Sequence, residues 1–175
     1  EKCEAGSNVE LGTLNESSNA QKWTLQKQES YSLEEGTYVA KSALDTSKLL
    51  DIAGGYTTNG ANIQIYQYNG STAQQFKIQY AGNGYYRIIS AKTGKSLDIY
   101  GGYTNDGTNI QQYTWNGSEA QLWKIVDLRN GYFYIRSKLG KGLDVYGGRS
   151  TSGTNVQLYS SNGSKAQSWV LKKLK

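Results

Sequence analysis

Four kinds of side chain recur three times in this chain at constant spacing. Each set begins with an aspartate that follows a leucine, and the three aspartates are 47 and 46 residues apart. A tyrosine lies 15 residues after each aspartate, an asparagine 18 and a glutamine 23. The sets are Asp51, Asp98 and Asp144; Tyr66, Tyr113 and Tyr159; Asn69, Asn116 and Asn162; and Gln74, Gln121 and Gln167. This regularity indicates an internal repeat whose units carry the same chemistry.

These residue types match the two surfaces of a sugar ring. The C–H face of a sugar packs on an aromatic ring, and its hydroxyls pair with carboxylates and amides. We expect the tyrosine to be the platform, the aspartate the main acceptor and the asparagine a rim contact, while the glutamine joins the ligand or braces the aspartate. The second and third units add Tyr100 and Tyr146 two residues after the aspartate, and the second adds Trp115. The sequence therefore predicts one shallow site per unit, strongest in the second and weakest in the first.

Enzymatic activity is the competing class, and the sequence argues against it. Glycoside hydrolysis needs two carboxyl groups about 5–9.5 Å apart, whereas each unit repeats only one. The chain has no histidine, its one cysteine is Cys3, and no group of metal ligands stands out. We expect no catalytic residue, no metal and no cofactor.

Short strands and tight turns must position these side chains. Segments such as 86–89 and 132–135 are rich in aromatic and β-branched residues, and Asn-Gly or Asp-Gly pairs lie between such segments. No stretch keeps a helical period. Propellers usually need at least four blades, so three units of about 46 residues favour an all-β β-trefoil.

The predicted domain boundaries follow the repeats. The trefoil spans 36–175, with units at about 36–82, 83–129 and 130–175. Residues 1–35 resemble the tail of a preceding unit, because Gln21-Lys22-Trp23 repeats the motif that ends each later unit. This half-repeat lacks the aspartate, so we expect it not to bind sugar. Its net charge is −4, against +9 for residues 36–175, which also indicates a separate structural element.

The motif that ends each unit carries a family resemblance over residues 36–175. Two units end in Gln-x-Trp, at 121–123 and 167–169, and the first has Gln74-Gln75-Phe76 instead. With Leu-Asp-Ile/Val near the start of each unit, this resembles the ricin B-chain type lectin family, in its bacterial carbohydrate-binding branch. The resemblance implies a β-trefoil, often appended to secreted glycoside hydrolases, with pockets built from the early Asp, the Tyr and polar groups near the unit's end. The closing Trp or Phe is expected to fill the core.

Composition narrows the partners. The mean hydropathy of −0.67 leaves no membrane span, and the scattered basic residues do not form a nucleic-acid surface. The family resemblance implies galactose-type or other neutral glycans as ligands, a secreted protein, and further domains of a larger protein as other partners. We expect binding to be weak at each site and multivalent. The chain starts without a signal peptide, as a mature secreted chain would. A protein-binding trefoil without sugar affinity is the alternative.

The three asparagines lie in Asn-Gly-Ser sequons. Glycosylation of these asparagines would block the sugar sites, so the sequons favour a bacterial source.

Overall fold

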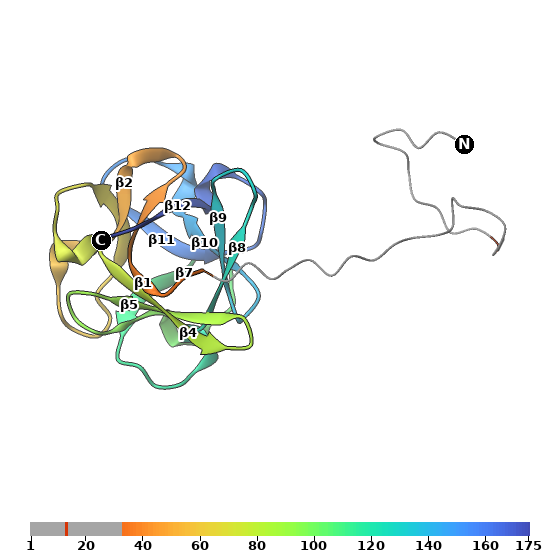
Figure 1. Cartoon of the computed structure of the whole chain (residues 1–175), viewed down its shortest axis with the longest axis horizontal. Coiled ribbons are helices and arrows are strands. Elements are labelled where there is room, and N and C mark those ends of the chain that lie inside the picture. The colour runs from red at the N-terminus through yellow and green to blue at the C-terminus, as the bar shows by residue number, and fades with distance from the viewer. Residues whose placement is uncertain (1–12, 14–32) are drawn as a thin grey trace. The chain divides into compact units, whose positions relative to one another are not determined.

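The computed structural model describes Thr13 and residues 33–175, and within them the fold is built from β-strands (Figure 1). The helical segments in this part of the chain are three-residue 3₁₀ turns. The predicted all-β class is confirmed, and so are strands at 86–89 and over most of 132–135. The strands are β1 (Gly36–Ser42), β2 (Asp45–Ile52), β3 (Ile63–Gln67), β4 (Phe76–Gly82), β5 (Tyr85–Ser90), β6 (Ser96–Ile99), β7 (Thr108–Tyr113), β8 (Trp123–Asp127), β9 (Phe133–Ser137), β10 (Gly142–Val145), β11 (Thr154–Tyr159) and β12 (Ser168–Lys173).

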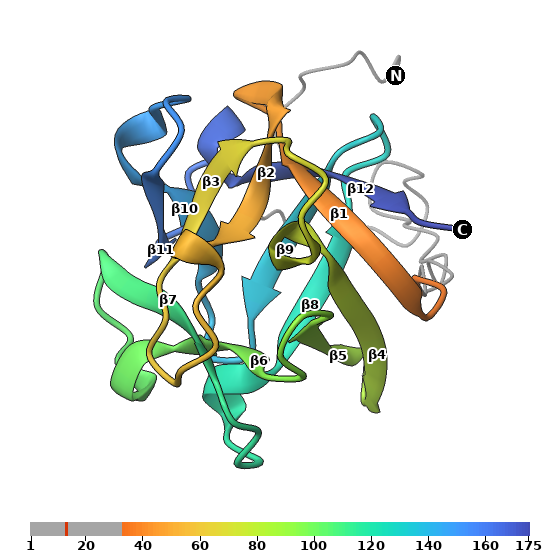
Figure 2. The same cartoon turned by 90° about the vertical axis from the view of Figure 1, so that its left-hand side faces the viewer.

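Six strands close into an antiparallel barrel and the other six form three hairpins. The barrel runs β1–β4–β5–β8–β9–β12 and returns to β1. The hairpins are β2–β3, β6–β7 and β10–β11. Figure 2 shows the hairpins on the left and the barrel strands on the right. Each predicted unit thus contributes two barrel strands and one hairpin, the arrangement of a β-trefoil.

The closing aromatic of each unit lies in the core, as predicted. Trp123 and Trp169 are fully buried and Phe76 is 3% exposed. The indole N–H of Trp123 donates to the carbonyl of Leu97 over 3.1 Å, and Trp169 does the same to Leu143 over 3.3 Å. Buried indoles need such partners, so each tryptophan joins its barrel strand to the hairpin that precedes it.

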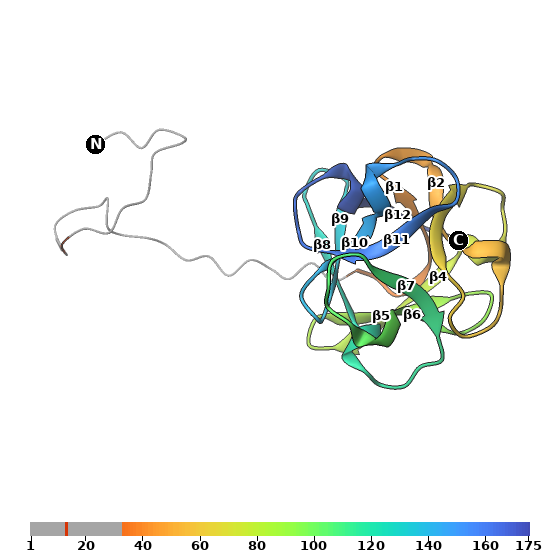
Figure 3. The ribbon, with the colours of Figure 1, turned by 180° about the vertical axis from the view of Figure 1, so that it is seen from behind.

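The three hairpins meet one another around the pseudo-threefold axis (Figure 3). Strand β11 pairs with both β3 and β7, and an isolated bridge joins Asn62 to Gln111. Asn109 donates to Asn62 and Asn155 donates to Asn109, each over 2.9 Å. These contacts hold the three hairpins as one rigid cap, so the side chains on each hairpin have fixed positions.

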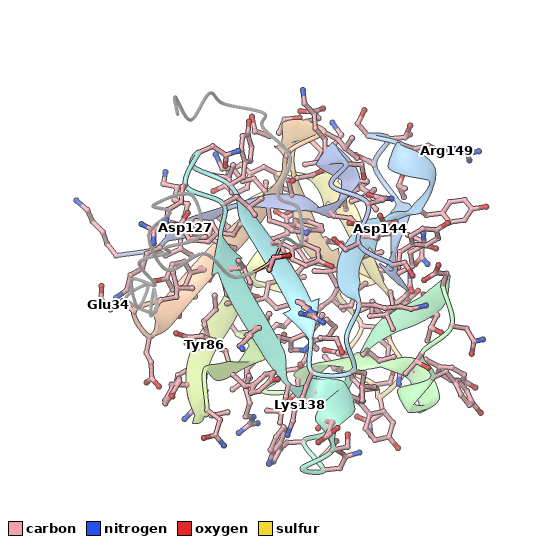
Figure 4. The ribbon with its side chains drawn as sticks, turned by 90° about the vertical axis from the view of Figure 1, so that its right-hand side faces the viewer. Glu34, Tyr86, Asp127, Lys138, Asp144 and Arg149 are labelled. Atoms are coloured by element: carbon pink, nitrogen blue, oxygen red, sulfur yellow. The ribbon has the colours of Figure 1, made fainter. Side chains whose placement is uncertain are left out.

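The predicted half-repeat at 1–35 lies almost wholly outside the described residues. Residues 33–175 belong to a single compact unit. Leu33, the first residue of the described range 33–175, packs in a small cluster with Tyr38, Ile78 and Tyr86, and its N–H donates to the Tyr86 hydroxyl over 2.9 Å. Tyr86 is labelled in Figure 4. No helix in the described part is long and apolar enough to cross a membrane.

Candidate functional site

The three repeated aspartates occupy the same place on the first strand of each hairpin. Asp51, Asp98 and Asp144 lie on β2, β6 and β10, directly across from Gln64, Gln111 and Gln157. In each pair the glutamine Nε2 donates to the aspartate Oδ1 over 2.8 Å. The 13-residue spacing in the sequence is therefore a cross-strand pair. It fixes one carboxylate oxygen and leaves the other without a hydrogen bond from the glutamine.

Burial of these carboxylates has an electrostatic consequence. Asp51 and Asp98 are 5% exposed. Removal from water raises the pKa of both carboxyl groups above 3.8. Side-chain hydrogen bonds oppose this rise in pKa, from Gln64 and Gln74 at Asp51 and from Gln111 and Gln121 at Asp98. A buried carboxylate gains further from polar hydrogens on a ligand, because each carboxylate oxygen can accept more than one hydrogen bond.

The repeated tyrosines lie beside the aspartates, on the second strand of each hairpin. Each is two residues beyond the paired glutamine, and alternate residues of a strand share a face. Tyr66, Tyr113 and Tyr159 are 40%, 38% and 37% exposed. An exposed ring next to a buried acceptor is the pair that the sequence predicted.

A tight turn after each aspartate shapes the surface beside it. Gly101 and Gly102 both have positive φ, 61° and 66°, and equivalent glycine pairs follow Asp51 and Asp144. A Cβ at Gly101 would overlap the Tyr103 ring. The glycines therefore allow the chain to fold back under Tyr100 and Tyr103, whose ring centroids are 6.1 Å apart.

Each aspartate–tyrosine pair lies in a hollow. The second-unit hollow has a volume of about 660 Å³, the third about 560 Å³ and the first about 340 Å³. These volumes fall in the order predicted for binding strength. The structure places the Asp, Tyr and Asn of each unit together in its hollow, and Tyr100 and Tyr146 line the second and third. Figure 4 labels Asp144 and Arg149 of the third unit. The lining residues that the sequence predicted are Asp51, Tyr66 and Asn69; Asp98, Tyr100, Tyr113 and Asn116; and Asp144, Tyr146, Tyr159 and Asn162.

The asparagines and the second glutamines organise the loop that closes each hollow. Asn116 Oδ1 accepts from the N–H of Ser118 over 3.0 Å. Gln121 is fully buried; its Oε1 accepts from the Asn116 N–H and its Nε2 donates to the Thr114 carbonyl, both over 3.0 Å. Gln74 and Gln167 make the equivalent bonds. Gln74, Gln121 and Gln167 are absent from the walls of these three hollows. Side-chain hydrogen bonds from Gln74 and Gln121 lower the pKa of Asp51 and Asp98, so the geometry favours bracing of the aspartate over ligand contact.

Each hollow also receives a residue from the neighbouring unit around the pseudo-threefold axis. Leu139 of the third unit lines the second hollow and Leu44 of the first unit lines the third, but Lys92 of the second unit takes this position in the first hollow. The positive charge of Lys92 lowers the pKa of Asp51, against the larger effect of burial. The first hollow is also smaller and more polar than the other two, and Ala53 stands where the second hollow has Tyr100.

Sequence reasoning missed several lining residues and misplaced one. Gln64, Gln111 and Gln157 line the hollows, and their constant spacing was the signal that could have included them. Tyr103 lines the second hollow, but the third unit has arginine at this place. Trp115, which entered the predicted ranking, is absent from this lining because it packs under the Arg87 guanidinium at 4.1 Å.

Comparisons with known proteins agree with this fold. A family profile described as "Ricin-type beta-trefoil lectin domain-like" matches residues 19–113 and 84–159. The designed threefold-symmetric protein ThreeFoil is 36% identical with a TM-score of 0.78, covering 79% of this chain and 99% of that one. An exo-β-1,3-galactanase from Clostridium thermocellum is 33% identical with a TM-score of 0.77; the match covers 82% of this chain and 31% of the galactanase. A ricin B-like lectin from Macrolepiota procera, solved in complex with lactose, is 26% identical with a TM-score of 0.70 over 82% of this chain and 100% of the lectin.

A search of curated protein sequences found no significant match. The family match covers most of the chain. The chain belongs to the ricin-type β-trefoil lectin domain-like family, and the family and its lectin neighbours support carbohydrate binding.

Proposed function

We propose that this chain is a non-catalytic lectin module with three weak sites for galactose-type or other neutral glycans. One observation carries the proposal: a buried aspartate, held by a cross-strand glutamine, lies beside an exposed tyrosine in a hollow three times over. In each site the aspartate accepts from sugar hydroxyls while the tyrosine ring packs on the C–H face. The asparagine side-chain amide binds at the rim.

Galactose is the favoured sugar because two similar proteins point to it. The lectin from Macrolepiota procera was solved with lactose, and the Clostridium thermocellum protein is a galactanase. The galactanase match also supports the proposal that this chain is a module appended to a secreted hydrolase.

We propose secretion from a bacterium, because the asparagines of the sequons inside the hollows would be glycosylated in a eukaryotic secretory pathway. We also propose that residues 1–35 are a degenerate half-repeat without a sugar site, and the family match beginning at residue 19 supports this.

The acidic residues near the hollows support binding over hydrolysis. Asp106 lines the third hollow, but Lys141 lies 2.6 Å away and, with Ser160, lowers the pKa of Asp106. Glu119 lines the second hollow and pairs with Lys138 over 3.0 Å. A general acid needs a raised pKa, whereas the pKa of Asp106 is lowered. In the second hollow the pKa of Asp98 is raised, but its neighbour Glu119 is held by Lys138. A protein-binding trefoil remains the alternative function.

A glycan array followed by calorimetry tests the proposal. Shallow sites predict a Kd on the order of 10⁻⁴–10⁻³ M for a monosaccharide or disaccharide, and a galactan should gain roughly 100-fold through multivalency. The matched control replaces Asp51, Asp98 and Asp144 together by asparagine and should lose binding to all array spots. If no glycan binds, the result favours the protein-binding alternative. Equal affinity for lactose and galactan would refute multivalency. Turnover of a bound glycan would refute the non-catalytic assignment.

A further inference from the structure

A fourth hollow, of about 380 Å³, lies where the first barrel strand and β12 meet the β2–β3 hairpin. Its apolar wall comes from Val39, Leu49, Leu174 and the ring of Tyr68. It shares Ser71 with the first sugar hollow, but no aspartate or glutamate lines it. Its chemistry therefore differs from that of the three aspartate sites.

The pseudo-threefold symmetry shows why this hollow is open. Val39, Arg87 and Tyr134 are equivalent, because each lies three residues before a buried serine that pairs with the closing aromatic of a unit. Leu49, Ser96 and Gly142 are likewise equivalent, because each pairs with the repeated tyrosine of its own hairpin. The corresponding loop positions are Tyr68, Trp115 and Ser161.

In the second unit the chain fills this place with a planar cation. The Arg87 guanidinium lies 4.1 Å from the centroid of the Trp115 ring, and its Nη2 is 3.4 Å from the Ser96 hydroxyl. The Arg87 Nε is buried without a hydrogen-bond partner among the described residues. Trp115 is consequently only 38% exposed.

In the third unit an aromatic ring fills the same place. Tyr134 packs so closely over Gly142 that a Cβ there would overlap its ring. The Tyr134 hydroxyl is buried and has no hydrogen-bond partner in the described part of the chain.

In the first unit the same place is left open, because Val39 is too short to fill it. Tyr68, which occupies the position of Trp115, is 61% exposed.

The charges at the rim specify the ligand further. Lys41 and Lys172 line the hollow, on neighbouring paired strands. Neither has a carboxylate within 4 Å among the described residues. We propose that this hollow binds a planar aromatic carboxylate: the ring takes the place that Arg87 and Tyr134 fill in the other units, packs on Tyr68, and directs its carboxylate to the two lysines.

Nuclear magnetic resonance titration with benzoate tests this proposal. We expect saturable shifts at the amides of Leu49, Tyr68 and Leu174, with little change near Asp98 and Asp144. Benzyl alcohol, which lacks the charge, and cyclohexanecarboxylate, which lacks the planar ring, should each bind at least about tenfold more weakly. Non-saturating shifts spread over surface lysines, or equal affinity for all three probes, would overturn the proposal.

The matched variant copies the second unit into the first. Val39→Arg with Leu49→Ser should fill the hollow and abolish benzoate binding, while lactose titration of the second and third aspartate sites stays unchanged. Unchanged benzoate binding would overturn the assignment. If circular dichroism shows that this variant does not fold, Lys41→Gln with Lys172→Gln on the surface should lower benzoate affinity at least about tenfold and leave benzyl alcohol unaffected. Equal benzoate affinity in that variant would overturn it as well.

Discussion

Gln111 donates from Nε2 to Oδ1 of Asp98 over 2.8 Å, directly across the β6–β7 hairpin. The bond orients the carboxylate, which also interacts with the side chain of Gln121. Replacing Asp98 by asparagine keeps an oxygen for Gln111 but presents an amide instead of a charged acceptor to the sugar. Loss of a charge-assisted hydrogen bond costs about 1.5–3 kcal/mol, so lactose affinity at the second site should fall roughly 10- to 150-fold by calorimetry.

The same variant should remain folded, because it removes a buried charge and keeps the hydrogen bond to Gln111. Its melting temperature should equal or exceed that of the parent at neutral pH. Asp45→Asn is the matched control, since Asp45 pairs with Lys48 on the surface and lines none of the three sugar hollows. An Asp98→Asn variant that binds like the parent would refute the site assignment, and one that unfolds would assign Asp98 a structural role.

Binding should depend on pH through the same carboxyl group. Burial raises the pKa of Asp98 above 3.8, so acidification protonates it at a higher pH than it would in the unfolded chain. Sugar affinity should fall as the pH drops through this raised pKa, while the contribution of Asp98 to the free energy of unfolding rises over the same interval down to about pH 3.8. Carboxyl-carbon resonances followed alongside calorimetry check both signs, and sugar affinity that stays constant while Asp98 protonates would contradict the prediction.

The Tyr113 ring should contribute through its face. Tyr113→Ala should weaken binding at the second site by about 1–2 kcal/mol through lost apolar contact, and Tyr113→Phe should change it little. Tyr80→Ala is a suitable control, because Tyr80 is 51% exposed on β4 and lines none of the three sugar hollows. A large loss in Tyr113→Phe would instead indicate that the hydroxyl binds the sugar.

Lys92 should limit the first site. Its ammonium interacts with Asp51, and competes there with sugar hydroxyls. Lys92→Leu, which copies Leu44 and Leu139, should raise the pKa of Asp51 further and increase lactose affinity several-fold at this site. The reciprocal change Leu139→Lys should weaken the second site. Failure of both substitutions to change affinity would show that the residue from the following unit does not control binding.

Constant spacing made the strands, the core aromatics and the aspartate–tyrosine pairs predictable. The roles of the two glutamines were harder to predict, because the sequence does not state cross-strand register. Gln111 holds Asp98 from across the hairpin and lines the hollow, while Gln121 lies outside the hollow wall and bonds both to the loop backbone and to Asp98. Lys92 and Leu139 reach hollows of the preceding unit, a contact between repeats that spacing within one repeat cannot show. Trp115 was misplaced because it lies beyond the end of β7, where strand alternation no longer fixes its direction.

Titration of ¹⁵N-labelled protein with lactose tests the central claim most directly, because each hollow has its own glycine amides as reporters. Gly101, Gly147 and Gly54 belong to the second, third and first hollows. We predict saturable shifts at all three, with the tightest binding at Gly101 and the weakest at Gly54, and loss of only the Gly101 shifts in Asp98→Asn. Saturable shifts confined to surfaces outside the three hollows, or no saturable shift with lactose or any array glycan, would contradict the account.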